Sequence, residues 1–113
     1  MQTLIEELVA LLEDKKCSRV KALDMAEVTS LADYFVLADA KNKKHAQAVA
    51  DYVTALMKTH GIGLLRENGY RDGEWILQDF GDMIVHIFIP QERDYYDLDT
   101  MWGDAPIASA AGE

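Results

Sequence analysis

Apolar residues recur at the spacing of an amphipathic helix in two segments of the chain. Residues 43–60 carry the longer stripe, and Gly61 follows it at the position where helices commonly end. The shorter stripe lies in residues 3–14 and consists of Leu4, Leu8, Leu11 and Leu12. The pattern therefore predicts two helices, each with one face that must be buried.

Five short runs of apolar and β-branched residues, bounded by turn-forming residues, predict strands. These runs are Cys17–Asp24, Tyr34–Ala38, Ile62–Arg66, Trp75–Gln78 and Met83–Ile89. The last run is apolar at six of its seven positions without alternation, which is typical of a central strand covered on both faces. The link 79–82 contains Gly81 and predicts a hairpin between the last two strands.

The order of these elements predicts the fold class. The first helix is followed by two strands, the long helix, three strands, and a short helix or turns over residues 91–102. Because the second and third strands flank the long helix, we predict a right-handed parallel crossover between them. The result is an α/β fold in which helices pack on a mixed β-sheet. Residues 1–104 form this single domain, and residues 105–113 are predicted to be a flexible tail.

Composition narrows the functional class. The chain has 113 residues, of which 50% are hydrophobic, so it suits one domain with an ordinary core. Twenty acidic and eleven basic residues give a formal charge of −9, which argues against a general nucleic-acid binder because phosphate requires a basic face. The single cysteine, Cys17, excludes an internal disulfide. No targeting or membrane segment is apparent, so we predict a cytoplasmic protein.

The charge is distributed unevenly along the chain. Residues 41–60 carry four lysines and one aspartate, a local charge of +3, whereas residues 70–104 carry two arginines and nine acids, a local charge of −7. The acidic segment also holds both tryptophans, Trp75 and Trp102, and three of the five tyrosines. Aromatic side chains among carboxylates fit a surface that binds a basic protein. Core tryptophans beside a solvated acidic surface would give the same pattern.

Candidates for chemistry are few. Asp79 and Asp82 in the predicted turn, with His86 on the following strand, could supply a metal or acid–base site. Aspartate and glycine also form such turns without a catalytic role, and His86 within an apolar run is typical of a buried, hydrogen-bonded histidine. Cys17 and His45 could form a nucleophilic pair, but no third residue that would orient them is apparent. We therefore predict no metal ion and no cofactor.

A lysine cluster lies at the start of the long helix, where an anion could bind. The cluster consists of Lys41, Lys43 and Lys44. It lacks the glycines of phosphate-binding loops, so a solvated helix start explains it better than an anion site does.

Three motifs resemble the ribosomal silencing factor family, also called the Iojap family. They are ADYFV at 32–36, WILQDFGDMIVHIF at 75–88 and YDLDTMWGD at 96–104, in the family's order and at its separations. His45 and the pair Ala50-Asp51 match as well, so the likeness covers about residues 3–104. The turn 38–44 departs from the family pattern, because it is more charged and lacks glycine.

The resemblance implies a translation repressor without catalytic activity. Such proteins bind the fourteenth protein of the large ribosomal subunit and sterically prevent the small subunit from joining, in starvation or stationary phase. The resemblance maps the partner surface onto these residues: Trp75, Ile76, Asp79, Asp82, Tyr96 and Trp102. Little direct contact with ribosomal RNA is expected, and Lys41, Lys43 and Lys44 are the candidates for it. Independently of the resemblance, the aromatic residues alone would also fit a small self-associating scaffold, so the chain is a candidate homodimer.

The fold of the family resembles that of nucleotidyltransferases, which keeps one alternative open. This alternative is a metal-dependent nucleotidyl- or phosphoryl-transfer enzyme that uses Asp79 and Asp82. The sequence lacks that superfamily's Gly-Ser motif with a downstream Asp-x-Asp, so the fold likeness by itself predicts no enzyme.

Overall fold

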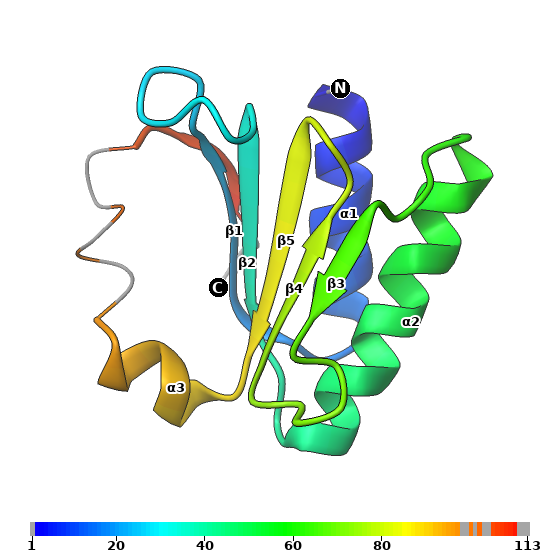
Figure 1. The fold of residues 1–113 in the computed structure, drawn as a ribbon, viewed down its shortest axis with the longest axis vertical. Coiled ribbons are helices and arrows are strands. Elements are labelled where there is room, and N and C mark those ends of the chain that lie inside the picture. Colours follow the sequence, from blue (N-terminus) through cyan, green and yellow to red (C-terminus); the bar gives the residue numbers. More distant parts are fainter. Residues whose placement is uncertain (1, 98–99, 101, 103–104, 111–113) are drawn as a thin grey trace.

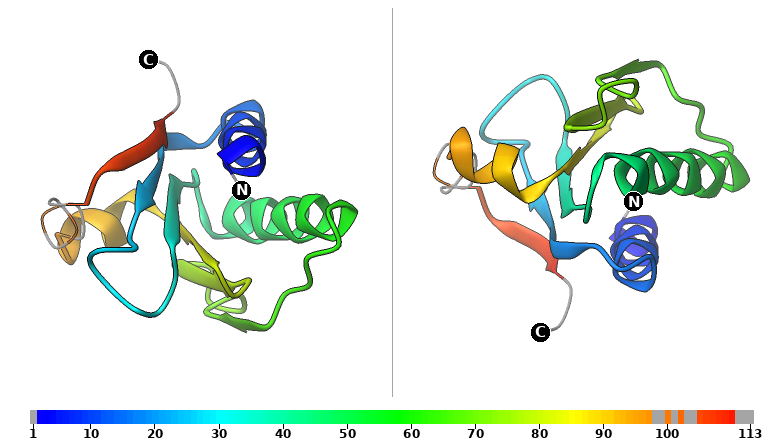
Figure 2. Two further views of the ribbon diagram at one scale, coloured as in Figure 1. Left: turned by 90° about the horizontal axis from the view of Figure 1, so that it is seen from above. Right: turned by 90° about the horizontal axis from the view of Figure 1, so that it is seen from below.

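A computed structural model describes residues 2–97, 100, 102 and 105–110. A mixed sheet of six strands forms the middle layer. Helices α1 (Gln2–Asp14) and α2 (Lys43–Thr59) cover one face, and the short helix α3 (Pro90–Tyr95) lies on the other, as Figure 1 and Figure 2 show. The prediction of one α/β domain with helices packed on a mixed sheet is confirmed.

The strands lie in the order β3-β4-β5-β2-β1-β6. Their bounds are Ser18–Asp24 (β1), Tyr34–Asp39 (β2), Arg66–Asn68 (β3), Trp75–Asp79 (β4), Met83–Phe88 (β5) and Ile107–Ala110 (β6). Strands β2 and β5 pair in parallel at the centre, and all other neighbouring pairs are antiparallel. Strand β5 is buried at all six positions, as its uninterrupted apolar run predicts. The hairpin of β4 and β5 is confirmed as well.

The strands before and after α2 run in parallel, as the predicted crossover requires, but the crossover does not join neighbouring strands. Strand β3 runs in the same direction as β2, but β4 and β5 lie between them. Helix α2 therefore belongs to a longer connection that leads from β2 through β3 and β4 to β5. Strand β5 is the neighbour of β2 at the centre of the sheet, because its apolar side chains can be buried on both faces. Strand β3 is polar and lies at the edge of the sheet.

The third strand also begins later than predicted. Ile62 and Leu64 pack against the core as part of the link that follows α2. Pairing with β4 starts where the Leu65 N–H donates to the Asp79 carbonyl at 2.8 Å. Strand β3 is therefore limited to Arg66–Asn68. The apolar residues at 62–64 that suggested a strand instead anchor the link between α2 and β3 to the core.

The prediction of a flexible tail from residue 105 is wrong for residues 107–110. These residues form β6, which pairs antiparallel with β1, and Ala105 before them is buried. Alanine and serine give little signal for a strand, but pairing at an edge requires only backbone groups. Helix α3 accounts for the first half of the predicted helix or turns at 91–102, whereas Leu98 and Met101 lie outside the described residues.

Helix α2 begins and ends as its sequence indicates. The Asn42 side chain accepts the His45 N–H at 2.8 Å and caps the first turn. Gly61 has a φ of +74°, a left-handed conformation that glycine adopts without strain, and the Ile62 N–H returns to the Met57 carbonyl at 3.0 Å. No helix in the described part of the chain is both long and apolar enough to cross a membrane.

Two apolar clusters, one on each face of the sheet, hold the layers together. The larger lies beneath α1 and α2 and includes the fully buried Leu8, Val53 and Val85. The smaller lies on the α3 face and includes Phe35 and Phe88. Successive residues of β5 alternate between the two clusters, so this strand connects both halves of the core.

A chain that ends at Asp104 should be less stable, because β6 belongs to the fold. The truncation removes Ala105 from the core and the hydrogen bonds between β6 and β1, each worth about 1 kcal/mol. We expect the melting temperature, followed by circular dichroism, to fall by about 8 °C or more. An unchanged melting temperature would show that residues 105–113 contribute nothing to stability.

Candidate docking surface

Strand β4 distributes the predicted partner residues over two sides of the sheet. Trp75, Leu77 and Asp79 are half-buried on the α3 face, whereas Ile76 and Gln78 are fully buried on the face beneath α2. The alternation follows from the two-residue period of a strand. Ile76 is therefore a core residue that a partner cannot reach in this structure, which corrects its assignment to the partner surface.

Five aromatic side chains gather with His86 on the α3 face: Phe35, Trp75, Phe88, Tyr96 and Trp102. The His86 ring lies 4.8 Å from Phe35 and 5.1 Å from Trp102, measured between centroids. The Trp75 ring lies 5.7 Å from Tyr96. Three of the six predicted partner residues, Trp75, Tyr96 and Trp102, thus come together in one cluster.

Burial determines the protonation state of His86. The residue is 3% exposed, and loss of hydration lowers its pKa from the ordinary 6.5 to about 3. The Trp75 indole N–H donates to Nδ1 at 3.2 Å, so the neutral ring carries its proton on Nε2. The prediction of a buried, hydrogen-bonded histidine is confirmed.

Asp79 stabilises the turn between β4 and β5. Its carboxylate accepts the Gly81 N–H at 2.8 Å and the Arg66 guanidinium at 3.0 Å. These contacts, the Gly81 hydrogen bond foremost, hold the pKa of Asp79 below its usual range. Asp82 is exposed in the same turn. The turn lies at the opposite end of the hairpin from Trp75, so the two acids are separate from the aromatic cluster.

The geometry does not favour the enzyme alternative. Both carboxylate oxygens of Asp79 are engaged. Among the described residues, no three His, Cys, Asp or Glu side chains gather in a way that could hold a metal ion. Burial raises the pKa of the Cys17 thiol to about 12, which disfavours the nucleophilic thiolate. Both ring nitrogens of His45 are hydrogen-bonded to backbone groups and are not directed at Cys17.

A buried ion pair fixes α3 on the sheet. Arg93, only 1% exposed, donates to the Asp39 carboxylate at 3.0 Å and to the Arg19 carbonyl at 2.9 Å. The Arg19 side chain donates to the other Asp39 oxygen and, at 2.9 Å, to Asp94 on α3. Sequence reasoning missed this network, because its members come from three segments whose meeting depends on the fold.

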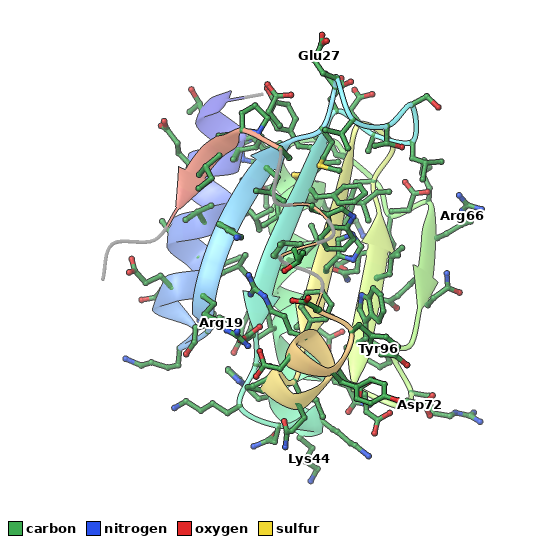
Figure 3. The ribbon with its side chains drawn as sticks, turned by 90° about the vertical axis from the view of Figure 1, so that its left-hand side faces the viewer. Arg19, Glu27, Lys44, Arg66, Asp72 and Tyr96 are labelled. Atoms are coloured by element: carbon green, nitrogen blue, oxygen red, sulfur yellow. The ribbon has the colours of Figure 1, made fainter. Side chains whose placement is uncertain are left out.

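The last residue of the fixed helix and the C-cap residue after it are tyrosines exposed to solvent. Tyr95 is 79% exposed and Tyr96 is 49% exposed, and their rings are nearly perpendicular at 5.0 Å. Exposed carboxylates accompany them at Asp94 and Asp97. Figure 3 looks onto this face, with α3 in front of the sheet and Tyr96 labelled. We define Trp75, Tyr95, Tyr96 and Trp102 as the aromatic surface, a combination that suits a basic protein partner.

The whole chain matches one protein family. The family model described as "Ribosomal silencing factor during starvation" covers residues 1–112. The chain belongs to the ribosomal silencing factor family. The ribosomal silencing factor RsfS of Halalkalibacterium halodurans is 37% identical over 111 residues, which cover 98% of this chain and 95% of the relative.

More distant relatives and solved structures agree with this family. A crystal structure of a Chromobacterium violaceum protein has a TM-score of 0.85 and 33% identity, over 91% of this chain and 86% of that one. A mouse protein named "Mitochondrial assembly of ribosomal large subunit protein 1" is 25% identical over 101 residues, 87% of this chain and 44% of its own length.

Membership in the ribosomal silencing factor family confirms the resemblance noted in the sequence, and the structure explains part of the motif at 75–88. Its first residue, Trp75, and its histidine, His86, are eleven residues apart and hydrogen-bond across β4 and β5. The motif thus contains both a residue of the aromatic surface and the buried residue beneath it.

Replacing Arg93 with methionine should destabilise the fold by about 3 kcal/mol, because Asp39 then loses a buried partner. Urea unfolding measures the difference. Lys43→Met is the matched control, since its pair with Glu74 is exposed and should contribute less than about 1 kcal/mol. Equal losses of unfolding free energy in the two variants would show that the buried ion pair contributes no more to stability than the exposed one.

Stability should fall as the pH falls below about 6.5, because the unfolded chain protonates His86 far more readily than the folded one. The contribution of neutral, buried His86 to the free energy of unfolding is complete above pH 6.5. It is lost as the pH falls toward the pKa of about 3 that His86 has in the folded protein. From pH 7 to pH 5, the wild type should lose about 2 kcal/mol more unfolding free energy than His86→Asn. Urea unfolding at both pH values tests this, and equal losses would contradict it.

Proposed function

We propose that this ribosomal silencing factor represses translation by binding the large ribosomal subunit and preventing the small subunit from joining. In this proposal the aromatic surface binds the fourteenth protein of the large subunit. The observation that carries the proposal is the exposure of Tyr95 and Tyr96 beside carboxylates on a firmly held helix. The name of the mouse relative, which refers to assembly of the ribosomal large subunit, supports the choice of subunit.

The aromatic surface has the physical properties of a docking site. Because Arg93 holds α3 through a buried ion pair, the helix loses little freedom when a partner binds. Tyrosine supplies a large contact area together with a hydroxyl group that can hydrogen-bond at the rim. The formal charge of −9 steers the chain toward a basic protein, as ribosomal proteins commonly are.

Repression by this route requires occupied space and no chemical step. The chain measures 33 × 32 × 28 Å along its principal axes. A body of this size, bound where the two subunits join, would keep their surfaces apart. The absence of a candidate metal site among the described residues is compatible with this mode of action.

Two further predictions concern the free protein. The chain acts in the cytoplasm, and it is a candidate homodimer. Sedimentation velocity over a range of concentrations measures the oligomeric state, and addition of large subunits then shows whether a dimer competes with the ribosome.

Subunit joining tests the proposal directly. Purified large and small subunits are mixed with excess chain, and the joined particles are separated by sedimentation. We expect fewer joined ribosomes and co-sedimentation of the chain with free large subunits. An undiminished yield of joined ribosomes would overturn the proposed mechanism.

Tyr96→Ala should weaken binding to large subunits by about 2 kcal/mol, or about thirtyfold, if Tyr96 is a central contact. Tyr70→Ala is the control, because Tyr70 is also exposed, at 36% against 49% for Tyr96, and lies outside the aromatic surface. This pair is more informative than Trp75→Ala, which also removes the hydrogen bond to His86. Co-sedimentation titrations measure both affinities. Equal affinities for the two variants would exclude Tyr96 from the interface.

A further inference from the structure

Two lysine-bearing segments that are far apart in the sequence meet at one end of the molecule. The link from α1 to β1 carries Lys15 and Lys16, and the link from β2 into α2 leads through Lys41 to Lys43 and Lys44. We define these five lysines as the lysine end. Lys44 marks it in Figure 3, opposite the end that carries Glu27.

His45 ties the two segments together. Its Nε2 donates to the Lys15 carbonyl at 2.7 Å, and its Nδ1 accepts the Lys41 N–H at 2.9 Å. Because the Lys15 carbonyl can only accept, Nε2 carries the proton and the ring that makes both bonds is neutral. The two lysine segments are therefore held side by side without an additional charge between them.

Three of the five lysines are available to a ligand. Lys16, Lys41 and Lys44 are exposed and form no ion pair within the part of the chain that the structure describes. Lys16 has a φ of +71°, a left-handed conformation that glycine adopts more readily than a residue with a Cβ. These three ammonium groups therefore remain open to a ligand with negative charge.

The acid nearest in sequence to Lys41 does not offset its charge. Asp39 lies two residues before Lys41 but is 2% exposed, and both of its oxygens are engaged by Arg19 and Arg93. The exposed partners of the lysine end are Asp14, 3.9 Å from Lys15, and Glu74, 3.4 Å from Lys43. The fold thus concentrates positive charge at one end of a strongly acidic protein.

We propose that the lysine end binds the phosphate backbone of ribosomal RNA next to the protein on which the aromatic surface docks. Lysine ammonium groups bind phosphates as point charges, and RNA presents a row of phosphates to which several lysines can bind at once. This inference rests on the proposed function, which places the chain on a particle of RNA and protein. The remaining surface repels RNA, so the contact is confined to the lysine end.

The lysine end adjoins the aromatic surface, which allows one particle to engage both. Gly73, in the loop before β4, packs directly on Lys43: a Cβ at Gly73 would stand 2.8 Å from the Lys43 Cβ and 2.9 Å from its carbonyl oxygen. The carboxylate of the next residue, Glu74, pairs with Lys43, and its backbone carbonyl accepts the Ile89 N–H at 2.9 Å, just before α3 begins. The loop before β4 therefore connects the lysine end with the aromatic surface through direct backbone contacts.

A salt series tests the contact on large subunits. Co-sedimentation affinities are measured between about 50 and about 200 mM salt, because each lysine–phosphate contact adds about 0.7–0.9 to the slope of log affinity against log salt. We expect Lys41→Gln/Lys44→Gln to reduce the slope by about 1.4–1.8. Lys58→Glu, at the other end of α2, changes the net charge equally and should leave the slope near that of the wild type.

A second measurement keeps this inference separate from the proposed function. A short RNA hairpin is titrated into the isotopically labelled chain, and we expect amide shifts at Lys15, Lys16 and residues 41–45 in the wild type only. Large-subunit binding with an unchanged salt slope and no such shifts would overturn the lysine contact and leave the docking proposal intact. Lysine-dependent shifts without large-subunit binding would overturn the docking proposal and leave the lysine–RNA contact intact. Absence of both would overturn both.

Discussion

Strands β2 and β5 pair in parallel from Tyr34 with Met83 to Asp39 with Phe88, and both are almost fully covered on both faces. Parallel neighbours end at the same edge of a sheet, where ligand-binding segments of α/β folds commonly lie. From this edge, β2 continues into the lysine link and α2, whereas β5 continues into α3. Both proposed binding surfaces therefore arise from one pairing, which also requires the long connection through α2, β3 and β4 (Figure 1).

Asp39, the last residue of β2, converts that arrangement into a rigid one. A carboxylate buried at this position would be strongly unfavourable alone, but Arg93 and Arg19 satisfy both of its oxygens. The network joins β1, β2 and α3 by directional contacts, which the apolar cluster on the same face does not provide. It gives α3 one position on the sheet, and with it one position for Tyr95 and Tyr96.

How much the sequence predicts depends on the kind of signal each element carries. Helix α2 and strand β5 are predicted because burial on one or both faces leaves a long apolar pattern. Strands β3 and β6 are misjudged because edge pairing uses backbone groups and tolerates polar or small side chains. Composition and the family motifs predict Trp75, Tyr96 and Trp102 as partner residues, and the structure brings them into one cluster. The same motif wrongly suggested Ile76, which strand alternation turns into the core. The role of Arg93 depends on three distant segments and leaves no local pattern.

The contact of Gly73 with Lys43 has a consequence for how binding energies combine. Two weak sites joined by a stiff connection act as a bivalent ligand, because occupation of the first holds the second at a high effective concentration near its target. The backbone contact removes the slack that a flexible loop would introduce between the sites. A larger side chain at position 73 would clash with Lys43, so the loop and the start of α2 would have to move apart and the avidity would weaken. Dissociation from the ribosomal subunit would then begin at either site, and loss of the contact at one site would speed dissociation at the other.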